Sequence, residues 1–133
     1  MFSEKNTFLI SGIIAGVYAV YAGLRYYTLS GEGLLQPREA KDKIAQGVIT
    51  RIIDVRTKTE YNAGHYDSKG KNVKLEHIPV TSFSKNKFKK MNKDTGVLVY
   101  CNTGQRARRA AELLRTYGFT NVFYIEGSYS SIE

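Results

Sequence analysis

Cysteine is nearly absent from this sequence, since Cys101 is the only one among 133 residues. A single cysteine excludes an internal disulfide framework, so disulfides give no indication of the redox compartment. It also excludes a zinc cage of cysteine and histidine, because only His65 and His77 remain as further strong ligands. We therefore predict that the chain uses no metal ion and no cofactor.

Acidic residues are also scarce, because 12 of them stand against 20 lysines and arginines and leave a net charge of +8. Such an excess suits nucleic acid, anionic lipid or small anionic substrates, and charge alone does not choose among them. Nucleic acid is the least favoured partner, since the lysines gather on one predicted helix (85–93) and one loop without a recognition motif. The length suits one folded domain.

Charge is missing altogether from the 18 residues Thr7–Leu24. This length is near the lower limit for a helix that crosses the hydrocarbon core, and the Arg-Tyr-Tyr sequence that follows is typical of an interfacial anchor. We predict a hydrophobic transmembrane-type helix, with residues 1–27 as a single-pass anchor that contacts the membrane through residues 7–27. More basic residues follow this segment than precede it, which predicts that the C-terminal domain lies on the cytoplasmic side.

Small residues recur at every fourth position of this segment, which would either allow a homo-oligomer through the membrane helix or merely fill a weakly hydrophobic span. Two alternatives to the anchor are a signal peptide cleaved after Ala22 and a buried core helix. The first lacks the positive charge that precedes a signal sequence, and the second lacks a polar face. We favour the anchor, followed by a linker at residues 28–33 and a folded domain at residues 34–133.

Strand and helix patterns alternate along the folded domain, with short connections. Apolar, β-branched runs predict strands, at residues 48–55, 97–100 and 121–125, and a short extended segment at 77–80. Three longer helices are predicted, at 38–46, from Ser82 or Ser84 to Met91, and at 106–117, together with a single helical turn capped by Thr59. Residues 66–76 are predicted to form a surface loop. This alternation predicts an α/β fold with a mainly parallel central sheet and helices on both faces.

Cys101 lies where a predicted strand ends and a predicted helix is about to begin. Backbone N–H groups and the helix dipole favour negative charge at such a place, and these conditions make a cysteine nucleophilic. Ligands of open α/β sheets also bind beyond the carboxyl ends of the strands. The alternative is a buried, unreactive cysteine at a strand end, and position alone leaves both interpretations open.

Several short motifs together resemble the rhodanese-like domain family, in shared order and spacing over about residues 34–127. They are Ile53-Asp54-Val55-Arg56, Glu60-Tyr61 with Gly64-His65, Ile78-Pro79, Cys101-x-Thr103-Gly104-x-Arg106, Ala110-Ala111-Glu112-Leu113-Leu114, Gly118-Phe119-x-Asn121-Val122 and Glu126-Gly127. The resemblance implies a rhodanese-like fold and a thiosulfate sulfurtransferase type of activity. A small donor such as thiosulfate or a persulfide would give sulfane sulfur to Cys101, and cyanide or an external thiol would take it from the resulting persulfide.

The same resemblance assigns roles to residues around the catalytic Cys101. The substrate-binding residues would be Asn102, Thr103, Gly104, Gln105 and Arg106, whose backbone N–H groups can hold an anion. Arg106 would hold the sulfonate end of the donor, and Asp54, Arg56 and His65 would support the sheet edge and loops. Because there is no second cysteine, the acceptor of the sulfur must be another molecule.

Two other functions use the same motifs. Related phosphatases separate the cysteine and the arginine by five residues, whereas four residues separate Cys101 from Arg106, and this smaller loop suits sulfur better than phosphate. The second alternative is a non-catalytic, membrane-tethered binding or adaptor module. An intact Cys101 and Arg106 argue against it, so sulfur transfer is the favoured prediction.

Overall fold

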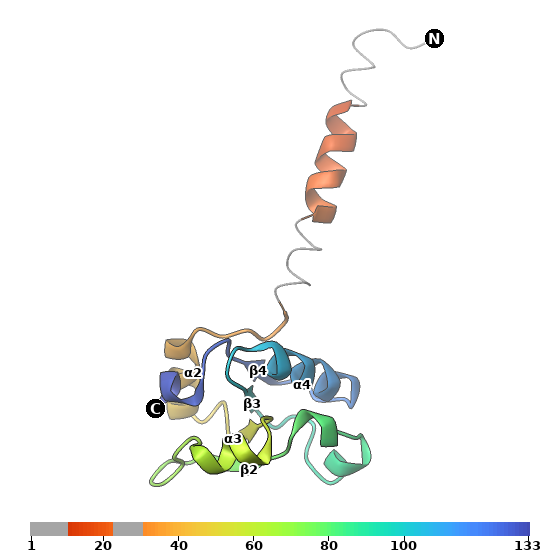
Figure 1. Cartoon of the computed structure of the whole chain (residues 1–133). Coiled ribbons are helices and arrows are strands. Elements are labelled where there is room, and N and C mark those ends of the chain that lie inside the picture. The colour runs from red at the N-terminus through yellow and green to blue at the C-terminus, as the bar shows by residue number, and fades with distance from the viewer. Residues whose placement is uncertain (1–10, 23–30) are drawn as a thin grey trace, which may run out of the picture. The chain divides into compact units, whose positions relative to one another are not determined.

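The computed structural model describes residues 11–22 and 31–133. The chain divides into two compact units, Met1–Glu32 and Gly33–Glu133 (Figure 1). In the first unit, residues 11–22 form a helix whose side chains are all exposed, with Tyr18 at 70%. No helix within the described ranges is both long enough and apolar enough to cross a membrane. Residues 7–10 and 23–27 of the predicted membrane segment lie outside the described residues. Residues 28–30 of the predicted linker also lie outside them. The anchor is therefore not confirmed by the structure and stays a prediction.

The second unit is built on a four-stranded sheet in which every pair of neighbouring strands is parallel. The strands are β1 (Arg51–Asp54), β2 (Lys74–His77), β3 (Val97–Tyr100) and β4 (Val122–Tyr124), in the order β2-β1-β3-β4. The last residue of β1, Asp54, is in register with Tyr100 at the end of β3. The predicted parallel sheet is thus confirmed, and β3 is one of its two central strands.

Helices cover both faces of this sheet, as predicted (Figure 1). They are α2 (Pro37–Ala45) and the short 3-10 helix η3 (Tyr129–Ile132), which contribute to one core, and α4 (Gln105–Thr116), which contributes to the other. The helix α3 (Lys58–Ala63) has no buried residue. Successive residues of β3 enter opposite cores, because side chains alternate across a strand. Val97 and Val99 pack in the core that contains the apolar face of α4, whereas Leu98 and Tyr100 pack in the core that contains Ala40 of α2.

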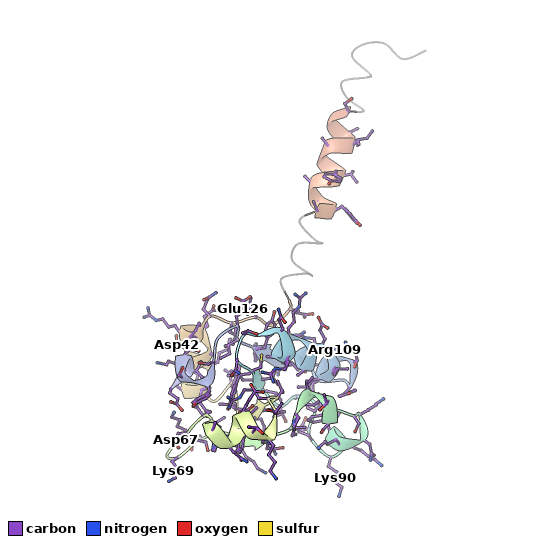
Figure 2. All side chains as sticks on the ribbon, in the orientation of Figure 1. Asp42, Asp67, Lys69, Lys90, Arg109 and Glu126 are labelled. Carbon is purple, nitrogen blue, oxygen red and sulfur yellow. The ribbon has the colours of Figure 1, made fainter. Side chains whose placement is uncertain are left out.

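The lysine-rich segment after β2 does not form the predicted helix to Met91. It contains two short 3-10 helices, η1 (Val80–Ser82) and η2 (Asn86–Phe88). Phe83 and Phe88 are five residues apart, a spacing that places them on different faces of an α-helix. In the structure their rings meet edge to face with centroids 4.9 Å apart, and Phe88 is buried in the core. Lys90 points outward from this segment (Figure 2).

Three further predictions of local structure differ from the structure. Thr57, not Thr59, is the N-cap of α3, and its hydroxyl oxygen accepts a hydrogen bond from the backbone N–H of Glu60. Residues 74–76, predicted as loop, belong to the edge strand β2, which pairs with β1 along its whole length. The predicted strand at 48–55 is shorter than expected, since β1 starts only at Arg51.

Candidate active site

Cys101 follows the last residue of the central strand β3, and its side chain is fully buried. Its Sγ accepts hydrogen bonds from the backbone N–H of Gly104 at 3.0 Å and of Ala107 at 3.4 Å. Gly104 is the N-cap of α4 and has a φ of 98°, in the left-handed region that favours glycine. The N–H groups of a first helical turn have no partner inside the helix, so they are available to the sulfur.

This arrangement stabilises negative charge on sulfur. Two N–H dipoles point at one atom, and the positive end of the α4 dipole lies beside it. A thiolate or the outer part of a persulfide benefits from such donors, whereas a neutral thiol benefits little. Of the loop that we predicted to bind substrate, residues 102–106, Gly104 supplies one donor, and the second comes from Ala107, just beyond it.

Arg106 is bound by Glu60, which comes from α3 on a different part of the chain. Its Nη1 donates to Oε1 at 2.7 Å and its Nη2 donates to Oε2 at 2.9 Å. The guanidinium holds the pKa of Glu60 well below its usual range, and Glu60 in turn raises the pKa of Arg106. The guanidinium that we expected to hold a donor's sulfonate therefore already has a carboxylate partner.

Glu60 makes two further sets of contacts. Its carboxylate accepts hydrogen bonds from the backbone N–H of Thr57 at 3.2 Å and from the Thr57 hydroxyl at 3.0 Å, which completes a capping box at the start of α3. It also accepts a hydrogen bond of 2.6 Å from the side-chain amide of Asn102. Glu60 thus joins α3 to the loop after Cys101. Sequence reasoning missed this residue as part of the site, although the Thr57-x-x-Glu60 spacing was a readable sign of a capped helix there.

Asp54 and Arg56 form a buried ion pair next to this loop. Arg56 Nη2 donates to Asp54 Oδ2 at 2.7 Å, and its Nε donates to Oδ1 at 3.0 Å. Asp54 also accepts a hydrogen bond of 2.7 Å from the hydroxyl of Tyr100, whose pKa is raised by burial and by this carboxylate. Arg56 reaches the carbonyl of Gly64 at 2.6 Å and the side-chain oxygen of Asn102 at 3.4 Å. These contacts place both residues beside the loop after β3, and the supporting role that we predicted for them stays a prediction.

His65 lies in an aromatic stack at the end of α3. Its ring stacks on Tyr61 with centroids 4.0 Å apart, and Tyr61 stacks on His77 at 4.4 Å. Its Nδ1 lies 2.9 Å from the carbonyl oxygen of Tyr61. Among the remaining predicted site residues, the side chains of Thr103 and Gln105 are exposed. Within residues 11–22 and 31–133, no group of three histidine, cysteine or acidic side chains could hold a metal ion.

Several known proteins are similar to part of this chain, including the following two. The tRNA uridine(34) hydroxylase of Buchnera aphidicola subsp. Baizongia pistaciae is 31% identical over an alignment of 81 positions, which covers 57% of this chain and 24% of that protein. The probable adenylyltransferase/sulfurtransferase MoeZ of Mycobacterium tuberculosis is 27% identical over 94 residues, which are 70% of this chain and 22% of MoeZ. The chain thus spans about a quarter of the length of these relatives.

The fold is shared with solved structures. The human single-domain sulfurtransferase TSTD1 matches 76% of this chain and 95% of its own, with a TM-score of 0.59 and 23% identity. The sequence pattern of the Rhodanese-like domain matches residues 36–133, which are well over half of the chain and include the whole site described above. On this evidence the chain belongs to the rhodanese-like domain family.

Proposed function

We propose that this protein is a sulfurtransferase that carries sulfane sulfur on Cys101. The observation that carries the proposal is the pair of N–H donors, Gly104 and Ala107, that both point at the Cys101 sulfur at the start of α4. Membership in the rhodanese-like family supports the proposal. The relative MoeZ, which is named a probable adenylyltransferase/sulfurtransferase, supports it as well.

The reaction has two half-steps. The Cys101 thiolate attacks the outer sulfur of the donor, the donor's S–S bond breaks, and its electron pair leaves with the donor remnant, which is sulfite when the donor is thiosulfate. The product is a Cys101 persulfide, whose negative charge the same N–H groups stabilise. A thiolate or cyanide then attacks the outer sulfur, and the Cys101 thiolate is the leaving group. Because Cys101 is the only cysteine, this acceptor is a separate molecule.

Incubation of the purified protein with thiosulfate or a low-molecular-weight persulfide should add one sulfur atom to its intact mass. Cyanide should then remove this sulfur, and the Cys101→Ser variant should not gain it, because a serine hydroxyl cannot form a persulfide. If the mass of the wild-type protein stays constant with both donors, sulfur transfer is excluded and the adaptor interpretation gains support.

We also propose that the N-terminal segment, residues 1–27, is a membrane anchor. The 18 uncharged residues Thr7–Leu24 support it, as do the exposed apolar side chains in the helical part, among them Ile13, Ile14 and Val17. Hydrocarbon would remove these side chains from water.

Cell fractionation tests the anchor. The full chain is expected to stay with the membrane fraction after an alkaline carbonate wash, whereas a variant without residues 1–27 is expected in the supernatant. That variant keeps both cores of the second unit, so it should fold. The Cys101→Ser variant of the full chain is the control and should follow the wild type. Recovery of the full chain in the supernatant would contradict an anchor.

A further inference from the structure

Four exposed lysines gather on the segment between β2 and β3, and the sulfur chemistry uses none of them. We call them the lysine surface: Lys85, Lys87, Lys89 and Lys90. No acidic residue interrupts the chain between Glu76 and Asp94. In the part of the chain that the structure describes, none of the four lysines takes part in an ion pair. Their charge is therefore not neutralised by the protein's own carboxylates.

The fold holds these lysines on the outside of a fixed segment. Backbone hydrogen bonds join residues three apart through most of it, and side chains three apart in such a 3-10 turn lie together. Lys87 and Lys90 therefore share one side of the segment, and Lys90 points away from the domain (Figure 2). Phe88 is buried in the core with α4, and its carbonyl oxygen accepts a hydrogen bond of 2.7 Å from the Lys93 ammonium. These two contacts fix the segment to the domain and leave the lysine surface exposed.

We infer that the lysine surface binds the anionic headgroups of a lipid bilayer. The inference rests on the proposed anchor, because an anchored chain keeps its folded unit beside a bilayer. Only residues 28–32 lie between the predicted anchor and the folded unit, and a chain of that length spans at most about 20 Å. The cytoplasmic side, on which we predicted the folded unit to lie, is also the side whose leaflet carries anionic lipid.

The kind of cation favours lipid headgroups over nucleic acid. Every basic residue between Val80 and Asp94 is a lysine, whereas α4 carries arginines. An ammonium is a point charge that suits a diffuse layer of headgroups, whereas a guanidinium suits paired contacts with individual phosphates. The two aromatic rings of the segment, Phe83 and Phe88, pack against each other and in the core, so they are not available to stack on bases.

Acetylation of lysines, mapped by peptide mass spectrometry, tests the inference on the full chain. The protein is reconstituted into vesicles of phosphatidylcholine alone or with about 30% phosphatidylserine, and is treated briefly with acetic anhydride. The anionic vesicles should slow acetylation of the lysine surface about fivefold relative to the neutral vesicles, and about 0.5 M sodium chloride should remove this difference. Lys41 is the internal control, because it is exposed on α2, which packs in the other core of the sheet. Its rate should be the same in both kinds of vesicle.

Charge reversal provides a matched pair of variants. The double variant Lys87→Glu, Lys90→Glu should abolish the protection of the two remaining lysines of the surface. The double variant Lys41→Glu, Lys69→Glu changes the net charge by the same amount and should keep the full protection of the lysine surface. Both of its positions are exposed, and Lys69 lies on the other side of the folded unit from Lys90 (Figure 2).

Three results would overturn the inference. One is an equal acetylation rate of the lysine surface in both kinds of vesicle, or an equal loss of rate at Lys41, and either leaves the anchor and sulfur transfer intact. Another is protection by a mixed-sequence RNA without protection by the anionic vesicles, which would assign the surface to nucleic acid. The third is failure of the full chain to float with neutral vesicles in a density gradient, which excludes the anchor together with the inference.

Discussion

Replacement of Gly104 by alanine is expected to slow sulfur loading of Cys101 about a hundredfold, the loss typical of removing one well-placed hydrogen-bond donor from an anionic centre. A Cβ at this position would lie 2.7 Å from the Cα of Glu126, and a backbone atom cannot move aside cheaply. The φ of 98° adds strain for any residue with a Cβ. The loop must therefore shift, and the N–H that reaches Sγ at 3.0 Å shifts with it.

Gly70→Ala is the control for this prediction. Gly70 has a φ of 71°, also in the left-handed region, but a Cβ there would meet no atom within 4 Å. The control shares the backbone strain of Gly104→Ala without the contact at Glu126. Its loading rate, followed by intact mass, should stay near that of the wild type. Equal loading by the Gly104→Ala and wild-type proteins would show that this donor is not needed.

Removal of the carboxylate in Asp54→Ala is expected to lower the free energy of unfolding by about 3–5 kcal/mol, the cost of leaving a buried charge without its partner. Asp54 is fully buried and Arg56 is 4% exposed, so water cannot replace the lost carboxylate. The hydroxyl of Tyr100 would lose its acceptor in the same variant. Urea unfolding followed by circular dichroism measures the change.

Glu76→Ala provides the comparison within the same sheet. Glu76 pairs with Arg51, and about a quarter of each side chain is accessible to solvent. Solvent screens such a pair, so its loss should change the free energy of unfolding by only about 0–1 kcal/mol. Similar losses in Glu76→Ala and Asp54→Ala would contradict the role assigned to burial.

The position of Cys101 and the parallel sheet could be predicted from sequence because they depend on local patterns. The run Val97–Tyr100 is apolar at every position, as expected of a strand that is buried on both faces. Gly104 and the amphipathic pattern after it mark the start of a helix. Strand and helix then alternate, which favours parallel pairing whatever the details of each contact.

The edge strand β2 could not be recognised in this way. Its sequence, Lys-Leu-Glu-His, has one apolar residue, and it is held by backbone pairing with β1 and by the ion pair between Arg51 and Glu76. These contacts join residues that are far apart in the sequence. A polar edge strand therefore resembles a loop until its partner is known.

The contacts of Glu60 are a second case. Forty-six positions separate Glu60 from Arg106 in the sequence, and 42 separate it from Asn102. A contact between residues so far apart leaves no periodic pattern in the sequence. The charge of Arg106 was therefore predicted to be available to the sulfonate of a donor. The second N–H donor to the sulfur was missed for another reason, since a backbone N–H of Ala107 carries no side-chain signature.

The central place of β3 in the sheet also keeps Cys101 away from both edge strands. The segments that follow its neighbours β1 and β4 flank the loop, with Arg56 hydrogen-bonded to Asn102 and Glu126 next to Gly104. Fraying of an edge strand would not uncover Cys101. A donor must instead approach the buried sulfur at the loop after β3, where Asn102, Thr103 and Gln105 are exposed.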